Sequence, residues 1–304
     1  MNDVGQPRGL PRARNAGEAS ERLAGWLLQH AGCGALLALS GGADSAFLLD
    51  ACARVLGPGR LLAVTSRSES LPPGELEAAR AQAAATGVEH LALEGSELDL
   101  EAFRRNAPDR CFHCKDALYG ELARVAAQRG LPLVLDGTNA DDLDGHRPGY
   151  AAGLRHAVRS PLLECGIGKD LVRQLSRERG LATWDKPAEA CLSSRFPHGT
   201  EVTPAALLRV AACEAALKAL GLRTVRVRVH DPVARIEVPP EDLPRLLAPG
   251  VREQAVAALK AQGFAFVALD LEGYRSGSLQ EPLRGPAPGL VTLAPLPAPG
   301  GFAR

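Results

Sequence analysis

Three of the seven cysteines lie in polar surroundings, where a thiol that only fills core space is not expected. Cys111 and Cys114 form a C-x-x-C pair in RCFHCK, at the start of a predicted helix. Cys191 lies in KPAEACLSSRFPHGT, which lacks helical or strand periodicity and is predicted to be a loop. A helix N-terminus lowers the pKa of a thiol and favours the thiolate. These three residues are therefore the first candidates for chemistry.

The C-x-x-C pair by itself can bind a metal, form a disulfide or have no function. A structural zinc site of four cysteines needs a second such pair, and the sequence has none. With Cys191 as a third thiolate, Cys111 and Cys114 could hold a four-iron–four-sulfur cluster and leave one iron open. Two unrelated thiols remain the alternative.

The hexapeptide SGGADS (residues 40–45) joins a predicted strand to a predicted helix. Gly41 and Gly42 allow the backbone to approach a ligand, and the helix start offers free N–H groups and a positive dipole end to an anion. Ser40 and Ser45 add hydroxyl donors. The GK[ST] ending of a Walker A loop is absent. An ordinary strand–helix turn capped by Asp44 is the alternative.

The elements that must position these residues change in type along the chain. Up to about residue 160, short apolar strands alternate with helices, which predicts an α/β fold with a doubly wound parallel sheet. Its strands are expected at 34–40, 61–65, 89–93 and 133–135. The alternating runs VRVRVH and ARIEV, the strand 264–271 and the helices around them predict a smaller α+β C-terminal domain. We expect a flexible arm (1–17), a first domain (18–160), a second domain (161–280) and a Pro- and Gly-rich tail (281–304).

Polar residues follow two of the predicted parallel strands. DGTNADD (136–142) comes after the fourth strand, and Thr65 lies at the end of the second. Ligands of such sheets bind at the carboxyl ends of the strands, so both segments are expected at one crevice with SGGADS. Asn139 and Asp142 are candidates to contact a nucleotide or Mg²⁺, with Asx-turn chemistry as the alternative.

Composition and charge narrow the class of protein. The 304 residues carry a formal net charge of zero, which argues against a dominant nucleic-acid surface. No apolar run reaches the roughly 18 residues of a membrane span, and the N-terminus lacks the apolar region of a secretory signal. An odd number of cysteines without such a signal argues against a disulfide framework. We therefore expect a cytoplasmic protein with neither a nucleic-acid nor a membrane partner.

These motifs carry a resemblance to a known family. SGGADS resembles the PP-loop of the ATP pyrophosphatases, which transfer AMP to a substrate oxygen and release pyrophosphate. The pattern over about residues 18–280 resembles the LarE-type ATP-dependent sulfurtransferases, which act on pyridinium-3,5-biscarboxylic acid mononucleotide, a precursor of the nickel-pincer nucleotide cofactor. The matching blocks are SGGADS, RCFHCKDALY, DGTNADD, SPLLECGIGKDLVR, WDKPAEACLSSRFPHGT, RVRVHDPVARIEV and LDLEGYRSGSL.

The resemblance implies that ATP and Mg²⁺ activate a substrate carboxylate and that sulfur at Cys191 then displaces AMP. In one branch of the family the cysteine gives up its own sulfur. In the other, three cysteines hold an iron–sulfur cluster that carries an extra sulfide, and Cys111 and Cys114 match that branch. Asp44 and Arg195 are expected to act with Cys191, and the resemblance also implies a homo-oligomer, often a hexamer.

Arginines of the second half suit an anionic substrate. Arg226 and Arg228 lie two residues apart on one face of a predicted strand, Arg195 follows Cys191 by four residues, and Arg275 lies in GYRSGS. The planar guanidinium binds carboxylate and phosphate groups, so all four are candidates to bind the pyridinium mononucleotide. Solvated surface arginines are the alternative.

Three rival functions remain open. A tRNA thiolase can combine a PP-loop with a C-x-x-C pair and a third cysteine, although the neutral charge and the block around Cys191 argue against it. An amide-forming PP-loop ligase would need an ammonia source and would not need Cys191. A non-catalytic nucleotide-binding module would release no pyrophosphate with any substrate.

Overall fold

The structure is a computed structural model that describes residues 11–30, 32–143, 148–275 and 277–278. The expected tail (281–304) and the first ten residues of the expected arm lie outside this described part. Within the rest of that arm, the backbone N–H of Ala13 donates to the carbonyl of Gly166 at 2.9 Å. The Asn15 side chain accepts from the N–H of Glu18 and caps the first helix.

A four-stranded sheet forms the centre of the N-terminal half. Its strands are β1 (Ala35–Ala38), β2 (Leu61–Arg67), β3 (Glu89–Glu94) and β4 (Leu133–Leu135). All neighbours pair in parallel, in the order β3-β2-β1-β4. The expected parallel sheet is therefore confirmed. Because the strand order reverses between β1 and β4, their carboxyl ends form the crevice at which such sheets bind ligands.

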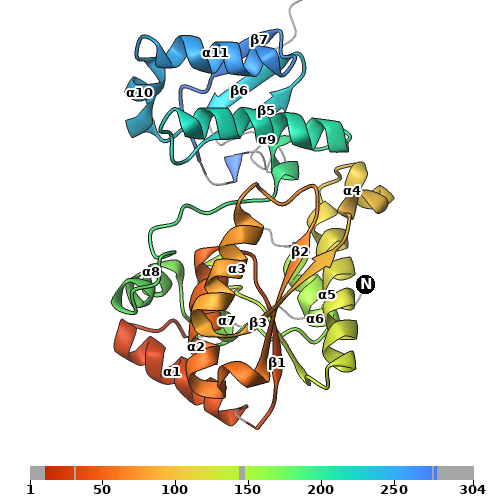
Figure 1. The fold of residues 1–304 in the computed structure, drawn as a ribbon, viewed down its shortest axis with the longest axis vertical. Helices are drawn as coiled ribbons and strands as arrows, with labels where there is room; N and C mark the ends of the chain where they lie inside the picture. The colour runs from red at the N-terminus through yellow and green to blue at the C-terminus, as the bar shows by residue number, and fades with distance from the viewer. Residues whose placement is uncertain (1–10, 31, 144–147, 276, 279–304) are drawn as a thin grey trace, which may run out of the picture.

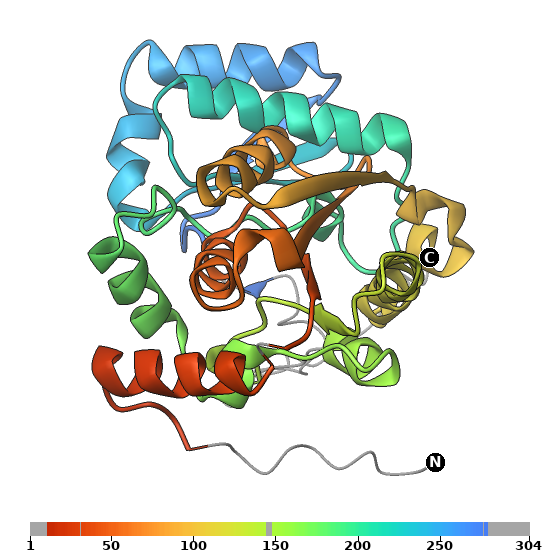
Figure 2. The same cartoon turned by 60° about the horizontal axis from the view of Figure 1, so that its bottom comes forward.

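Helices cover both faces of this sheet (Figure 1). Successive side chains of β1 point to opposite faces: Ala35 and Leu37 enter one apolar core and Leu36 enters another. The first core is completed by α1 (Ala16–Gln29), α2 (Ala43–Leu56), α3 (Glu75–Thr86) and α8 (Lys169–Glu178). The second is completed by α5 (Arg110–Gln128) and α6 (Pro148–Arg155). In Figure 2, α2 and α5 lie on opposite sides of the strands.

The C-terminal domain is a three-stranded sheet covered by helices. Strand β5 (Arg226–His230) pairs antiparallel with β6 (Val233–Glu237), and β6 pairs in parallel with β7 (Phe266–Leu269). Its helices are α9 (Pro204–Ala219), α10 (Leu243–Leu247) and α11 (Val251–Ala261). The Thr203 hydroxyl accepts from the N–H of Ala206 and caps the N-terminus of α9.

Short elements link the longer helices and strands. They are α4 (Glu101–Arg104), α7 (Pro161–Glu164) and 3₁₀ turns at Pro58–Arg60, Glu97–Asp99, Ala140–Leu143, Leu192–Arg195 and Pro240–Asp242. Phe103 of α4 packs in the same apolar cluster as Leu192 and Phe196, which belong to the Cys191 segment (residues 186–200). Among the described residues, no helix is both long and apolar enough to cross a membrane.

Candidate active site

The loop Ser40–Ser45 leaves β1 and opens α2. Gly41 has φ +82°, and a Cβ there would meet the backbone carbonyl oxygen of Glu75 at 2.6 Å, so this position requires glycine. Gly42 is the N-cap of α2, and no side chain caps the helix. Asp44 therefore does not act as the cap. The N–H groups at this end remain available for an anionic ligand.

Residues after β4 pack against this loop. The Asn139 side-chain amide donates to Asp44 at 3.1 Å, and Gly137 approaches so closely that a Cβ would lie 2.9 Å from the Ser45 nitrogen. Burial, followed by the nearby carboxylate of Asp142, raises the pKa of Asp44. Asp142 also pairs with Lys169 at 3.1 Å. The carboxylates of Asp44 and Asp142 thus lie close together at the N-terminal end of α2.

Some of the expected nucleotide contacts are engaged within the protein. The Thr65 hydroxyl is buried and donates to the carbonyl of Leu39 at 2.6 Å. The Asp141 N–H donates to the Asn139 side-chain oxygen at 2.9 Å, and the Asn139 N–H donates to Asp142 at 3.2 Å. Asx-turn chemistry is therefore present, and the same Asn139 side chain reaches Asp44.

Lys186 connects the Ser40–Ser45 loop to the segment that carries Cys191. Its ammonium donates to the Gly41 carbonyl at 2.9 Å and pairs with Glu75 at 2.7 Å. Farther along the same segment, the Leu192 N–H donates to the carbonyl of Ser70 at 2.8 Å, in the loop after β2. The Cys191 segment is therefore anchored at the carboxyl ends of the parallel strands.

Three predicted substrate arginines hold the Cys191 loop by its backbone carbonyls. Arg195 donates to Ala190 at 2.6 Å and to Cys191 at 3.0 Å. Arg226 donates to Ala188 at 2.6 Å, and Arg228 donates to Ser194 at 2.7 Å. Residues 226–229 of strand β5 are all buried, because this loop covers the side that carries the arginines.

Buried carboxylates balance these guanidinium charges. Glu214 of α9 accepts from Arg195 at 2.8 and 2.7 Å, and Glu237 of β6 accepts from Arg228 at 2.9 and 2.7 Å. Arg195 has no solvent exposure. Arg275 differs, since its side chain is 40% exposed and pairs with Glu272 at 2.6 Å. Arg195, Arg226 and Arg228 thus serve loop geometry, whereas Arg275 can reach solvent.

The three candidate thiols face a common region. The Cys191 Sγ lies 3.0 Å from the Ser193 hydroxyl. Desolvation raises the pKa of Cys111, and the neighbouring Cys191 adds to this. Burial raises the pKa of Cys114, with further contributions from Glu97, Cys191 and Cys111. The helix N-terminus was expected to lower these pKa values; desolvation and the mutual repulsion of thiolates outweigh it.

The thiols do not form the site of a single metal ion. In the described part of the chain, no three His, Cys, Asp or Glu side chains stand close enough together to bind one ion. A four-iron cluster makes a different demand, because each thiolate binds a separate iron and the sulfurs stay farther apart. Three thiols from two segments fit that donor chemistry, and the Glu97 carboxylate accepts from the Cys114 thiol at 3.9 Å. All seven cysteines are free thiols, as the odd count suggested.

Comparison with known proteins assigns the family. No protein-family model matches the chain. The pyridinium-3,5-bisthiocarboxylic acid mononucleotide synthase of Lactiplantibacillus plantarum is 36% identical over 250 residues, which cover 81% of this chain and 89% of that protein. The chain belongs to this family. The uncharacterized protein slr1717 of Synechocystis is 43% identical over 82% of this chain and 92% of its own length. The uncharacterized protein MJ0830 of Methanocaldococcus jannaschii is 30% identical over 59% of this chain.

The candidate site includes residues that the sequence did not predict. Lys186 and Arg110 carry no spacing signal. Glu214 does carry one, because the buried residues of α9 are Leu207, Val210, Cys213, Glu214 and Leu217. A glutamate on the apolar face of a helix indicates a buried charge that requires a cationic partner.

A further hydrogen-bond network connects the helix of the C-x-x-C pair to the end of β4. Asp136, at the end of β4, accepts from the hydroxyls of Tyr119 and Ser160, each at 2.6 Å. Lys115 donates to the Tyr119 hydroxyl at 2.7 Å and lies 3.7 Å from Asp136. Burial raises the pKa of Asp136, but Lys115 and the hydroxyl donors outweigh it and hold this pKa below its usual value. The network ties the helix of the C-x-x-C pair to the crevice of the sheet.

Proposed function

We propose that this protein is an ATP-dependent sulfurtransferase of the PP-loop type, acting on the carboxylates of pyridinium-3,5-biscarboxylic acid mononucleotide. The observation that carries the proposal is the direct connection of two sites. Lys186 joins the anion-binding loop Ser40–Ser45 to the segment of Cys191. The relative from Lactiplantibacillus plantarum is named for the corresponding bisthiocarboxylic product.

In the first step, a substrate carboxylate oxygen attacks the α-phosphorus of ATP, and the bond to the bridging oxygen of pyrophosphate breaks. The N–H groups at the start of α2, together with the hydroxyls of Ser40 and Ser45, would receive the pyrophosphate. Asp44 and Asp142 would hold Mg²⁺, which offsets the charge on the phosphates. Asn139 would keep the Asp44 carboxylate in place through the observed hydrogen bond.

In the second step, sulfur attacks the acyl carbon of the adenylate, the acyl–oxygen bond breaks, and AMP leaves with both bonding electrons. We propose that Cys111, Cys114 and Cys191 hold a four-iron–four-sulfur cluster, which would supply the sulfide. The arginines that donate to the loop carbonyls would hold the backbone around Cys191 in place. Direct loss of sulfur from Cys191 is the alternative source.

The role of the arginines is divided in this proposal. Arg195, Arg226 and Arg228 act on the substrate through the loop that they position, because their donors already reach its carbonyls and buried carboxylates. Arg275, with an exposed side chain, would bind a carboxylate or the phosphate of the substrate directly. We further propose a cytoplasmic homo-oligomer that requires neither nucleic acid nor membrane.

Pyrophosphate release tests the proposal against its rivals. The purified protein is mixed with Mg²⁺-ATP and, in separate reactions, the pyridinium biscarboxylate mononucleotide, unmodified tRNA, or a carboxylate with ammonia. Release with the pyridinium compound alone supports the proposal. Release with tRNA would assign a tRNA thiolase, ammonia-dependent release would assign a ligase, and no release with any substrate would leave a nucleotide-binding module.

A further inference from the structure

Two buried polar residues join the segment before the C-x-x-C pair to the segment after Cys191. The Arg110 guanidinium donates to the carbonyl of Ser193 at 2.8 Å. The Asn106 amide donates to the carbonyls of Phe196 at 3.3 Å and Pro197 at 2.8 Å. Asn106 has no solvent exposure and Arg110 is 4% exposed. We call these two side chains the Asn106–Arg110 clamp.

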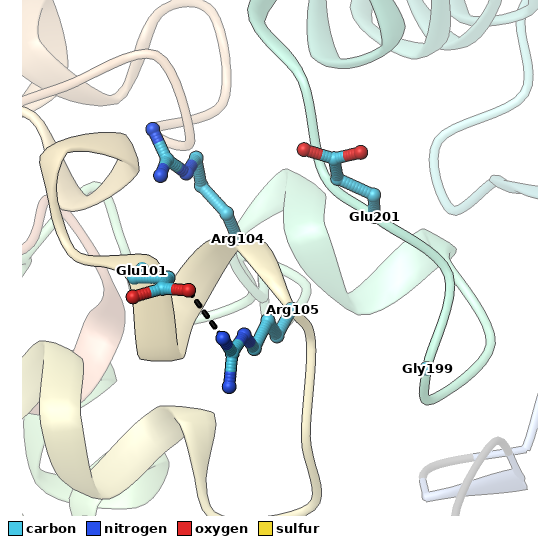
Figure 3. Close-up of a pocket in the computed structure, with 5 residues that line it drawn as sticks. All are labelled: Glu101, Arg104, Arg105, Gly199 and Glu201. Atoms are coloured by element: carbon cyan, nitrogen blue, oxygen red, sulfur yellow. Dashed lines mark hydrogen bonds and ion pairs between the residues drawn. The ribbon is translucent and has the colours of Figure 1, made fainter.

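The clamp is reinforced by the backbone and by its own internal contact. The Gly199 N–H donates to the Asn106 carbonyl at 3.0 Å, and the Val202 N–H donates to the Arg104 carbonyl at 2.9 Å. Figure 3 shows the end of α4, with Arg104 and Arg105, beside the loop that carries Gly199. Arg110 also donates to the Asn106 side-chain oxygen. This hydrogen bond restricts the orientation of both side chains.

Apolar residues also pack between the same two segments. Leu98 and Phe103, which precede the clamp, pack in one cluster with Leu192, Phe196 and Val202. Any displacement of the Cys191 segment would therefore expose apolar surface and leave the buried donors of the clamp unpaired. Both costs oppose movement.

The placement of the clamp beside the thiols suggests a role beyond packing. Arg110 immediately precedes Cys111, and its acceptor Ser193 lies two residues after Cys191. One guanidinium thus connects the neighbours of two thiols that belong to distant parts of the chain. Asn106 has φ +54°, a left-handed conformation that asparagine tolerates better than most residues. That conformation brings its amide to the Cys191 segment.

We propose that Asn106 and Arg110 are positioning residues that set the distance between the C-x-x-C thiols and Cys191. The inference rests on the proposed function, since this distance matters to the reaction only if the three thiols act together. The geometry itself can be tested without ATP, substrate or metal.

Thiol cross-linking with dibromobimane measures the distance in the metal-free, reduced full-length chain. The reagent joins two nearby thiols, and peptide mapping separates Cys111–Cys114 products from products that join Cys191 to either residue. The Cys111–Cys114 product forms within one helix and serves as the internal reference. Asn106→Gly removes the amide without straining the positive φ, and Arg110→Met removes the donors at similar length. Arg105→Met is the matched control, because that side chain is 73% exposed.

We expect both clamp variants to lower the ratio of Cys191 products to the reference by about tenfold, which corresponds to about 1.4 kcal/mol. Arg105→Met should keep the wild-type ratio, and Arg110→Lys, which retains the charge and one donor group, should recover part of it. Thermal unfolding reports whether each variant is folded. If Arg110→Met is unfolded, the cross-linking ratios of Asn106→Gly and Arg110→Lys test the proposal. Unchanged ratios in folded clamp variants would overturn the proposal, as would a wild-type chain that forms only the reference product.

The outcomes for the clamp and for the function remain separable. A tenfold drop in the clamp variants of a protein that transfers no sulfur would refute the proposed function and leave the clamp intact. Unchanged ratios in a protein that does transfer sulfur would refute the clamp alone.

Discussion

Removal of Arg195 should strongly destabilise the C-terminal domain. Its guanidinium is fully buried and forms two hydrogen bonds with Glu214, at 2.8 and 2.7 Å. Arg195→Met would leave the Glu214 carboxylate buried, where it would still accept from the Val227 N–H at 2.9 Å. Breaking a buried ion pair in this way costs about 3–5 kcal/mol of unfolding free energy. The exposed pair Arg105–Glu101 is the control, and Arg105→Met should cost about 0.5 kcal/mol.

Urea unfolding followed by circular dichroism measures these costs, and a double variant tests their cause. Glu214→Gln can still accept from Val227, so the Arg195→Met/Glu214→Gln chain contains no unpaired buried charge. It should regain about 2 kcal/mol relative to Arg195→Met alone. The rest of the loss should persist, because the carbonyls of the Cys191 loop stay without their donor. A cost for Arg195→Met no larger than that of the surface control, or strict additivity in the double variant, would refute this reasoning.

Three further changes test other parts of the site. Gly41→Ala should lower the free energy of unfolding by about 1–2 kcal/mol because of the positive φ at this position, and should abolish ATP binding in a calorimetric titration. Gly42→Ala, at φ −78°, should have smaller effects on both. Equal effects of the two substitutions would contradict the role assigned to the loop. The pKa of Asp136 is lowered on folding, so its carboxylate stabilises the fold above its unfolded pKa and loses this effect as the pH falls through its folded pKa. Ser160→Ala removes one hydroxyl donor and raises the folded pKa of Asp136. Acid unfolding of this variant, followed by circular dichroism, should therefore occur at higher pH. Because the pKa of Asp44 is raised, Mg²⁺-ATP affinity should weaken as acid protonates it, and equilibrium dialysis should show no such pH dependence in Asp44→Asn.

The strands of both sheets were predictable because each is a short apolar or alternating run bounded by turn residues. The strand order β3-β2-β1-β4 was not, because local periodicity carries no information about which strands pair. Helices α6 and α7 were missed, since Pro148–Arg155 and Pro161–Glu164 are too short to establish a helical period.

Sequence spacing placed Arg226 and Arg228 on one face of their strand but could not show what covers that face. The cover is the Cys191 loop. The carbonyls that Arg228 and Arg226 reach in it lie 34 and 38 residues away in the sequence, and only the tertiary fold brings them there. Asn106 and Arg110 were missed for the same reason, because their acceptors lie 83 to 91 residues away.

The most direct test of the central claim is the mass of the product formed by the wild-type chain and by Cys191→Ala, with the pyridinium biscarboxylate mononucleotide and Mg²⁺-ATP. Liquid chromatography and mass spectrometry detect each replacement of a carboxylate oxygen by sulfur, and Cys33→Ala serves as the matched thiol control. We predict ATP-dependent thiocarboxylate from the wild type and from Cys33→Ala, with none from Cys191→Ala even though that variant still releases pyrophosphate. Thiocarboxylate formed by Cys191→Ala at the wild-type level would contradict the account.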